Sequence, residues 1–310
     1  MRPKVGIIGA TGYAGSEVVR WLLGRAELTV YSSSRVGERL AEAVPALEGF
    51  TDEVFRPIDP KELSGLDAVV LATPHGVARD LVRGIDAPVI VDLSRDHRHV
   101  HGWAYGQVEW NRDQLVGAPR IAVPGCFATA ISLSLAPLVA AGVARGPFHV
   151  TAMTGSTGSG ATASAGTHHP LRFANTRAYK VLTHQHVPEI EAFLATLGGS
   201  HRVQFVPLSG PVDRGIFATS FADVGRADAF DLFRRAYGDA PYVRLREGTP
   251  ELRHVRGTAL ADLTVYQEAE TAVVLAAIDN LGKGAAGQAV QCLELALGLE
   301  PETRRPSWTP

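Results

Sequence analysis

The chain opens with Lys4-Val5-Gly6-Ile7-Ile8-Gly9-Ala10-Thr11-Gly12-Tyr13-Ala14-Gly15, an apolar run that breaks into glycines three residues apart. An amphipathic stretch, residues 16–23, follows. This order predicts a buried strand, a tight turn and the start of a helix. Glycines there let the backbone approach a pyrophosphate, and N–H groups at the helix N-terminus face the anion. The sequence therefore predicts a dinucleotide-binding turn with contacts from Gly9, Thr11, Gly12, Tyr13, Ala14 and Gly15.

The end of the next predicted strand, residues 28–32, bears on the choice of cofactor. An NAD site places an Asp or Glu about 20 residues after the glycines, on the ribose 2′-hydroxyl. This strand instead leads into Ser33-Ser34-Arg35, with no acid. Hydroxyls and a guanidinium suit a 2′-phosphate, so we expect NADP bound through Ser34 and Arg35. The alternative is a solvated turn rich in serine.

Composition sets modest bounds on function. The 310 residues carry a net charge of −2 and 45 % hydrophobic content, which is enough for two folded cores. The chain has no overall positive charge that would favour nucleic acid or an anionic membrane as a partner. No apolar run reaches the roughly 20 residues of a membrane helix, and a strand follows Met1 at once, so we expect a cytoplasmic protein without a signal peptide. Two cysteines match a reducing compartment.

Strand and helix patterns predict an α/β protein of two domains. Up to residue 125, short apolar strands alternate with helical segments, which is typical of a parallel, Rossmann-type sheet. From residue 149, strands joined by turns and few helices predict a mixed α+β domain. We expect a dinucleotide-binding domain at residues 1–125, with 281–310 packing back onto it, and a catalytic and oligomerisation domain at residues 126–280. A helix over 285–297 precedes a tail, 301–310, expected to be loosely held.

Cys126 is the candidate nucleophile. It follows Pro124-Gly125 and precedes a long apolar helix predicted over residues 128–141, so it falls at a helix N-terminus. That position favours the thiolate, which attacks carbonyl carbon, and first-turn N–H groups can stabilise an oxyanion. The competing interpretation is a buried cysteine that packs like a small hydrophobe. Cys292, in Val290-Gln291-Cys292-Leu293, fits that second description.

Among the eleven histidines, His184 and His186 are the candidates for acid/base chemistry. They flank a Pro-Glu helix start, and an extended segment would place both rings on one face. A His-x-His pair can also bind metal, but no third ligand stands nearby at zinc spacing. His168 follows a Gly/Ser/Thr-rich loop, residues 154–166, that offers donors to an anionic substrate or is simply a surface loop. The other histidines, including His97, His99, His101, His201 and His254, are expected at the surface.

The chain resembles the N-acetyl-γ-glutamyl-phosphate reductases and the related reductases of LysW-carried aminoadipyl phosphate. The matching segments span nearly the whole sequence: residues 9–15, 74–78, 92–94, 124–126, 184–190, 214–216 and 277–284. The resemblance implies a glyceraldehyde-3-phosphate-dehydrogenase-like architecture and homo-oligomers. It also implies a nucleophile at Cys126, NADP at the glycine turn and at Ser34 and Arg35, and a nicotinamide-side contact at Asn280. Arg214 is a plausible anchor for a substrate carboxylate or phosphate.

The resemblance leaves two substrates to choose between. Thr157-Gly158-Ser159-Gly160-Ala161 lacks the arginine that many acetylglutamyl enzymes carry, and Thr167-His168-His169-Pro170 is similar to the LysW-dependent enzymes. Residues 186–190 are similar to the acetylglutamyl enzymes. An acidic carrier protein would need a broad basic surface, which this balanced chain lacks, so we favour the acetylated small molecule.

The expected reaction is NADPH-dependent reduction of an acyl phosphate through a Cys126 thioester, with release of an aldehyde. One of His184 and His186 would move the proton. Aspartate-semialdehyde dehydrogenase is a rival enzyme, against which the His-x-His-x-Pro-Glu motif argues. A redox-sensing regulator that binds NADP without catalysis is the rival from another class.

Overall fold

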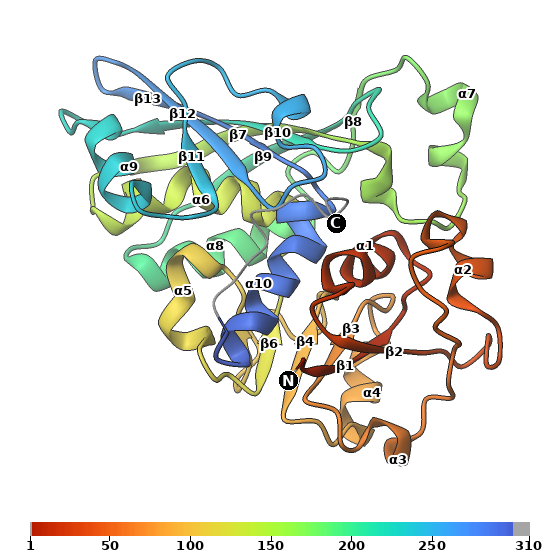
Figure 1. Cartoon of the computed structure of the whole chain (residues 1–310). Helices are drawn as coiled ribbons and strands as arrows, with labels where there is room; N and C mark the ends of the chain where they lie inside the picture. Colours follow the sequence, from red (N-terminus) through yellow and green to blue (C-terminus); the bar gives the residue numbers. More distant parts are fainter. Residues whose placement is uncertain (1, 300–310) are drawn as a thin grey trace. The chain divides into compact units, whose positions relative to one another are not determined.

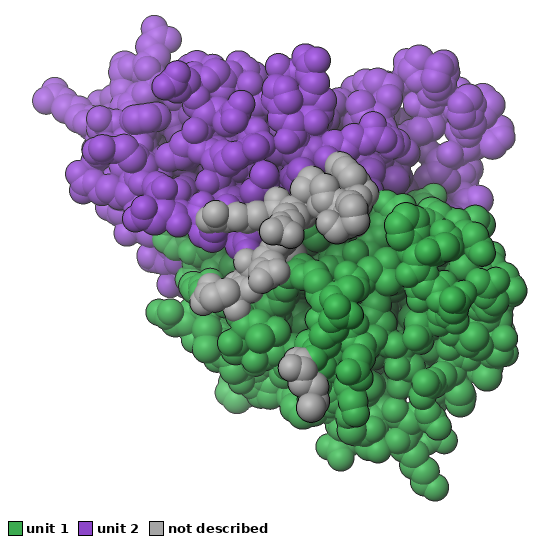
Figure 2. Space-filling model, in the orientation of Figure 1, with its two compact units in different colours: residues 1–125, 285–310 green, residues 126–284 purple. Residues whose placement is uncertain are grey.

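The computed structural model describes residues 2–299, so the predicted loose tail lies outside the described residues. The chain divides into two compact units (Figure 2): unit 1 comprises Met1–Gly125 with Ala285–Pro310, and unit 2 comprises Cys126–Gly284.

Unit 1 is built on a parallel sheet with the strand order β2-β1-β3-β4-β6-β5 (Figure 1). Its strands are β1 (Lys4–Ile8), β2 (Glu27–Tyr31), β3 (Ala68–Leu71), β4 (Val89–Asp92), β5 (Ala104–Tyr105) and β6 (Arg120–Ala122). The predicted parallel sheet is confirmed. Strands β3 and β4 are buried at every residue, which explains their uninterrupted apolar sequences. The two-residue strand β5 was not predicted, because two residues carry no periodicity.

The helices of unit 1 are α1 (Tyr13–Leu22), α2 (Leu40–Ala43), α3 (Pro60–Leu63), α4 (Ala78–Leu81), α5 (Val108–Leu115) and α10 (Gly287–Ala296), with 3₁₀ turns at Pro45–Leu47 and Val82–Gly84. Helix α10 is the predicted closing helix, and it packs against α1, α5 and β4. Cys292 lies on α10 and is completely buried. Its thiol donates to the carbonyl of Gly106, as expected for a cysteine of the core.

Unit 2 is built on a mixed sheet with the strand order β11-β12-β13-β10-β7-β9-β8. Its strands are β7 (Arg145–Thr154), β8 (Arg177–Ala178), β9 (Val203–Ser209), β10 (Ile216–Asp223), β11 (Val243–Leu245), β12 (Ala261–Glu268) and β13 (Thr271–Ile278). Alternate residues of β10 are buried, from Ile216 onward, because α6 (Cys126–Ala140) packs on that face. The other helices are α8 (His186–Leu197), on β9, and α9 (Ala229–Tyr237), on β12 (Figure 1).

The segment between β7 and α8 of unit 2 has little regular structure. It contains 3₁₀ turns at Ser156–Ser159 and Ala165–Thr167, the one-turn helix α7 (His169–Arg172), and β8. Lys180 and Leu182 adopt positive φ angles of 43° and 58°, which are unfavourable for residues with a Cβ. The remaining short elements of unit 2 are a 3₁₀ turn at Leu252–His254 and a π-helical turn at Gly282–Ala286, which ends in unit 1. Within residues 2–299, no helix combines the length and apolarity needed to cross a membrane.

Candidate functional site

The glycine turn of unit 1 has the geometry of a dinucleotide cradle. Gly9 has a φ of 91°, and a Cβ there would lie 2.4 Å from the carbonyl oxygen of Ala72, after β3. A Cβ on Gly15 would lie 2.1 Å from the carbonyl oxygen of Gly9, so this glycine lets α1 pack against the turn. Gly12 is the N-cap of α1 and supplies no capping side chain, which leaves the positive helix end for an anion. These residues fit a nicotinamide dinucleotide.

Arg35, expected to hold a 2′-phosphate, lies in an exposed turn after β2. The hydroxyl of Ser32 accepts from the N–H groups of Ser34 and Arg35 at 3.3 Å each. The guanidinium of Arg35 pairs with both carboxylate oxygens of Glu38, at 2.7 and 2.8 Å. Glu38 is therefore a functional candidate that the sequence analysis missed. Its spacing of three residues from Arg35 was the available signal.

Cys126 is the first residue of α6 in unit 2, so the helix begins two residues earlier than predicted, and the side chain of Cys126 is partly exposed. Gly284, in the π-helical turn, approaches it so closely that a Cβ on Gly284 would lie 2.9 Å from the Cβ of Cys126. The N–H of Gly284 donates to the carbonyl of Asp279 at 2.9 Å. The backbone after Asp279 thus forms a wall beside the thiol that tolerates no larger side chain.

His184 and His186 lie together in unit 2, with ring centroids 4.8 Å apart. Gln185 between them has helical backbone angles and is the N-cap residue of α8, so the segment is not extended as the metal alternative would require. Both rings are buried, at 3 % and 9 % exposure. Nδ1 of His184 accepts from the N–H of His186 at 3.2 Å, so neutral His184 carries its proton on Nε2. Burial, and then the charge of Lys180, lowers the pKa of His184 to about 4.

Aromatic rings connect the histidine pair to the nucleophile's helix. Phe127, the neighbour of Cys126, stands edge-on to His184 at 5.3 Å and to His186 at 6.1 Å between centroids. Tyr179 contacts His184 at 5.7 Å. Burial raises the pKa of Tyr179, and negative charge on Cys126 raises it further. Tyr179 therefore keeps its phenolic proton within the electrostatic influence of Cys126, and the only signal in the sequence was its nearness to the His-x-His motif.

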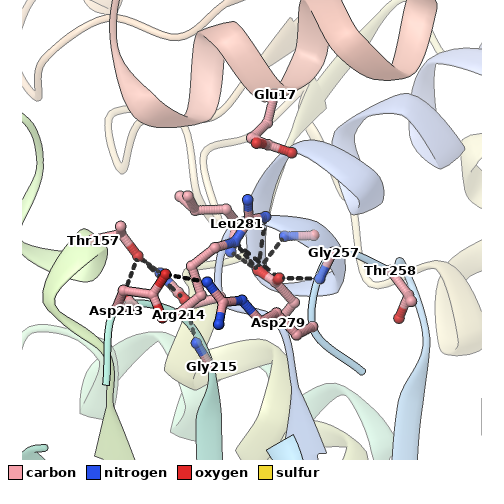
Figure 3. A network of polar contacts seen from close by, with 12 residues as sticks. Glu17, Thr157, Asp213, Arg214, Gly215, Gly257, Thr258, Asp279 and Leu281 are labelled. Atoms are coloured by element: carbon pink, nitrogen blue, oxygen red, sulfur yellow. Dashed lines mark hydrogen bonds and ion pairs between the residues drawn. The ribbon is translucent and has the colours of Figure 1, made fainter. Parts of the chain in front are cut away.

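Asp279, directly after β13, organises a buried network of polar contacts (Figure 3). Its carboxylate is inaccessible to solvent and accepts from the N–H groups of Gly257, Leu281 and Gly282. Nε of Arg214 lies 3.0 Å from Asp279 Oδ2 and 3.3 Å from Oδ1. The predicted anchor Arg214 is thereby held in one orientation by a buried carboxylate.

Asn280 continues this network, which we name the Asp279 corner (Asp213–Gly215, Thr157, Gly257 and Asp279–Gly284). Its Oδ1 accepts from the N–H of Gly215 at 2.7 Å, and its Nδ2 donates to the hydroxyl of Thr157 at 3.0 Å. The Thr157 hydroxyl donates in turn to the carbonyl of Asp213 at 2.7 Å (Figure 3). Asn280 is only 2 % exposed, so the structure shows it joining three segments of the chain.

His168 and His97 differ in their surroundings, since the first is exposed and the second is buried. His168 is exposed and is the N-cap residue of α7, where its carbonyl accepts from the N–H groups of Leu171 and Arg172. His97 was expected at the surface, and this was wrong. It is buried at the end of β4, stacks on Trp103 at 3.9 Å, and its Nδ1 lies 2.7 Å from the buried carboxylate of Asp92. Charged neighbours in sequence concealed this contact.

Both units of the chain match models of known protein families. Residues 4–118 match the family model described as "Semialdehyde dehydrogenase, NAD binding domain". Residues 126–280 match "Semialdehyde dehydrogenase, dimerisation domain". The first match supports a nicotinamide cofactor and agrees with the geometry of the glycine turn.

Curated relatives cover almost the full length. Proteins named N-acetyl-gamma-glutamyl-phosphate reductase are 40 % identical in Halorhodospira halophila, with 96 % of each chain covered, and 38 % in Salinispora arenicola, with 98 % of each covered. Solved structures show the same fold at lower identity. Aspartate semialdehyde dehydrogenase II from Vibrio cholerae has a TM-score of 0.77 at 17 % identity, covering 96 % of this chain and 99 % of that one. A probable aspartate-semialdehyde dehydrogenase from Pseudomonas aeruginosa has a TM-score of 0.76 at 19 % identity, with the same coverage.

Proposed function

Since this chain belongs to the N-acetyl-γ-glutamyl-phosphate reductase family, we propose that it reduces N-acetyl-γ-glutamyl phosphate to N-acetylglutamate semialdehyde in arginine biosynthesis. The observation that supports this most is Cys126 at the start of α6, next in sequence to Phe127, whose ring contacts the buried pair His184 and His186. This arrangement supplies a nucleophile and a proton carrier, which the reduction of an acyl phosphate needs.

Cys126 attacks the acyl carbon as a thiolate, the bond from that carbon to the phosphate oxygen breaks, and inorganic phosphate leaves. The covalent thioester divides one difficult step into two easier ones. When bound at the glycine turn, NADPH would supply the hydride. The thiohemiacetal oxygen then carries negative charge, and collapse to the aldehyde returns the electron pair of the C–S bond to Cys126. First-turn N–H groups of α6 face this charge.

His184 and His186 have different roles in this proposal. His184 is neutral near pH 7 because burial lowers its pKa to about 4, so it acts as a hydrogen-bond donor through Nε2. Transfer of a proton from neutral His184 would leave an imidazolate, which is too unstable. We assign the proton transfer to His186, which protonates the thiohemiacetal oxygen and takes the proton back on collapse. Arg214, oriented by Asp279, anchors a negatively charged group of the substrate.

We assign NADPH as the preferred cofactor. The glycine turn would hold the pyrophosphate, Ser34 and Arg35 the 2′-phosphate, and Asn280 would contribute on the nicotinamide side. Support comes from the lack of an acid at the end of β2 and from the exposed guanidinium of Arg35. We expect NADPH to be favoured over NADH by about 10-fold or more. Equal use of the two cofactors would contradict this assignment.

The match of unit 2 to a dimerisation domain supports a homo-oligomer, a dimer or a tetramer. Large apolar side chains such as Phe221 and Tyr266, at 43 % and 45 % exposure, lie on its sheet. Light scattering after size exclusion would give the mass. A monomer at micromolar concentration would contradict the proposal.

The reverse reaction tests the substrate. N-acetylglutamate semialdehyde should be oxidised with NADP and phosphate, with a KM below about 1 mM and little dependence on salt. A LysW-linked semialdehyde serves as the comparison, because recognition of an acidic carrier is strongly salt-sensitive. Turnover of the carrier-linked compound alone would assign the protein to the LysW-dependent branch. The roles proposed for Cys126 and the histidines would remain.

A further inference from the structure

Arg172, the last residue of α7, carries a guanidinium with unmet hydrogen-bonding capacity. Its Nε and Nη2 atoms are buried, and neither meets an acceptor among residues 2–299. Buried donors without partners are rare in folded proteins because each costs stability, and a charged donor costs more than a neutral one. A ligand that accepts hydrogen bonds from Nε and Nη2 would explain why these donors have no partner in the described part of the chain.

A second guanidinium makes this state more costly. Burial, and then the positive charge of Arg177, lowers the pKa of Arg172. Arg177 donates to the carbonyl of Gly166 at 3.0 Å. Within the described part of the chain, no carboxylate pairs with Arg172 or Arg177. Two neighbouring cations without a counter-ion favour the binding of an anion.

Tyr179 links Arg172 to Cys126, because both charges act on its phenol. Tyr179 responds to the charges of both Arg172 and Cys126, which act on its pKa in opposite directions. Tyr179 also contacts the ring of His184. An anion bound at Arg172 would thus lie on the side of unit 2 that carries the reacting groups.

We propose that Arg172 is a substrate-anchoring residue that binds an anionic oxygen pair of the acyl phosphate, from either its carboxylate or its phosphoryl group. This rests on the proposed function. A planar guanidinium with two adjacent donors matches either group in a bidentate pair. Arg172 would complement Arg214, which already has its carboxylate in Asp279.

Steady-state kinetics of the reverse reaction, with Arg172→Gln and Arg172→Lys, test this proposal. Arg172→Gln should raise one KM by about 10- to 100-fold, and Arg172→Lys by less, because lysine keeps the charge and loses the fork. An increase in the KM for inorganic phosphate assigns Arg172 to the phosphoryl group. An increase in the KM for the semialdehyde assigns it to the carboxylate. Arg235→Gln, at an exposed arginine of α9, is the control and should leave both values unchanged.

A thermal measurement separates anchoring from a structural role. Arg172→Gln removes two buried nitrogen donors, Nε and Nη2, that meet no acceptor among the described residues, so the Tm should stay or rise. A Tm lowered by several degrees, or both KM values within about 2-fold of the wild type, would overturn the proposal. Absence of N-acetylglutamate semialdehyde oxidation by the wild-type enzyme would instead contradict the proposed function. The two failures are therefore distinguishable.

Discussion

The Asp279 corner and the segment around Arg172 are two regions of unit 2 held together in opposite ways. In the corner, Asp279 accepts from three backbone N–H groups and pairs with Arg214, and Asn280 uses both ends of its amide. Around Arg172, two guanidinium groups lie near one another without a carboxylate from the described residues. The corner is held by its own paired groups, whereas two donors of Arg172 meet no acceptor among the described residues. The difference separates groups that fix geometry from groups that recognise a ligand.

The largest effect should come from Cys126, the proposed nucleophile, which Gly284 of the corner approaches closely. Cys126→Ser should lower kcat by at least about three orders of magnitude, because a hydroxyl is a far weaker nucleophile, while NADPH binding survives. The matched control is Cys292→Ser in the core of unit 1, which should retain activity within a few-fold. Steady-state kinetics and cofactor titration measure both. Substantial turnover by Cys126→Ser would remove the covalent mechanism.

Gly284→Ala tests the rigidity of the corner. The added Cβ would lie 2.9 Å from the Cβ of Cys126, so either the thiol or the corner must shift. A displacement of this kind should lower kcat by about 100-fold with little change in the Tm of unit 1. Gly248→Ala is the control, because its Cβ meets no atom within 4 Å. If both variants kept wild-type kcat, the corner would not position Cys126.

His184 predicts a pH dependence of stability. Its folded-state pKa of about 4 lies below the value of about 6.5 expected in the unfolded chain. The unfolded chain therefore binds more protons between these values, and stability is lost as the pH falls from 6.5 to 4. The full loss is about 3 kcal/mol. Denaturant titrations of His184→Gln should show a smaller loss over this interval than the wild type or the exposed control His254→Gln. Equal losses would show that His184 titrates normally.

The smallest effects should appear in the cofactor turn of unit 1. Arg35→Ala should reduce the preference for NADPH by about 10-fold, mainly through KM, because a guanidinium–phosphate pair is lost. Glu38→Gln should lower the KM for NADPH a few-fold, because it releases Arg35 and removes a negative charge. Arg39→Ala, beside the same turn, is the control. Unchanged cofactor preference in Arg35→Ala would show that the 2′-phosphate binds elsewhere.

Sequence patterns predicted the features that depend on residues close together in the chain. The glycine turn, the parallel strands of unit 1 and the helix that begins at Cys126 depend on spacing within a few residues, and all three are confirmed. The burial of Cys292 was also predicted, because its neighbours repeat at helical spacing.

Contacts between residues far apart in the chain could not be predicted from local sequence patterns. Asp279 lies within a segment recognised by resemblance, residues 277–284, yet its bonds to Gly257 and Arg214 depend on how the sheet of unit 2 brings distant parts of the chain together. Tyr179 and Arg172 acquire their importance from burial and from charges brought near by folding. His97 was misplaced for the same reason, since the carboxylate of Asp92 lies behind it.

The covalent step at Cys126 is the central claim, and peptide mass mapping tests it most directly. The enzyme is mixed with N-acetyl-γ-glutamyl phosphate in the absence of cofactor, quenched in acid and digested. We predict release of one phosphate per chain and an N-acetylglutamyl group on the peptide that contains Cys126, with neither in Cys126→Ser. Phosphate release without acylation of Cys126, or acylation at another residue, would contradict the account.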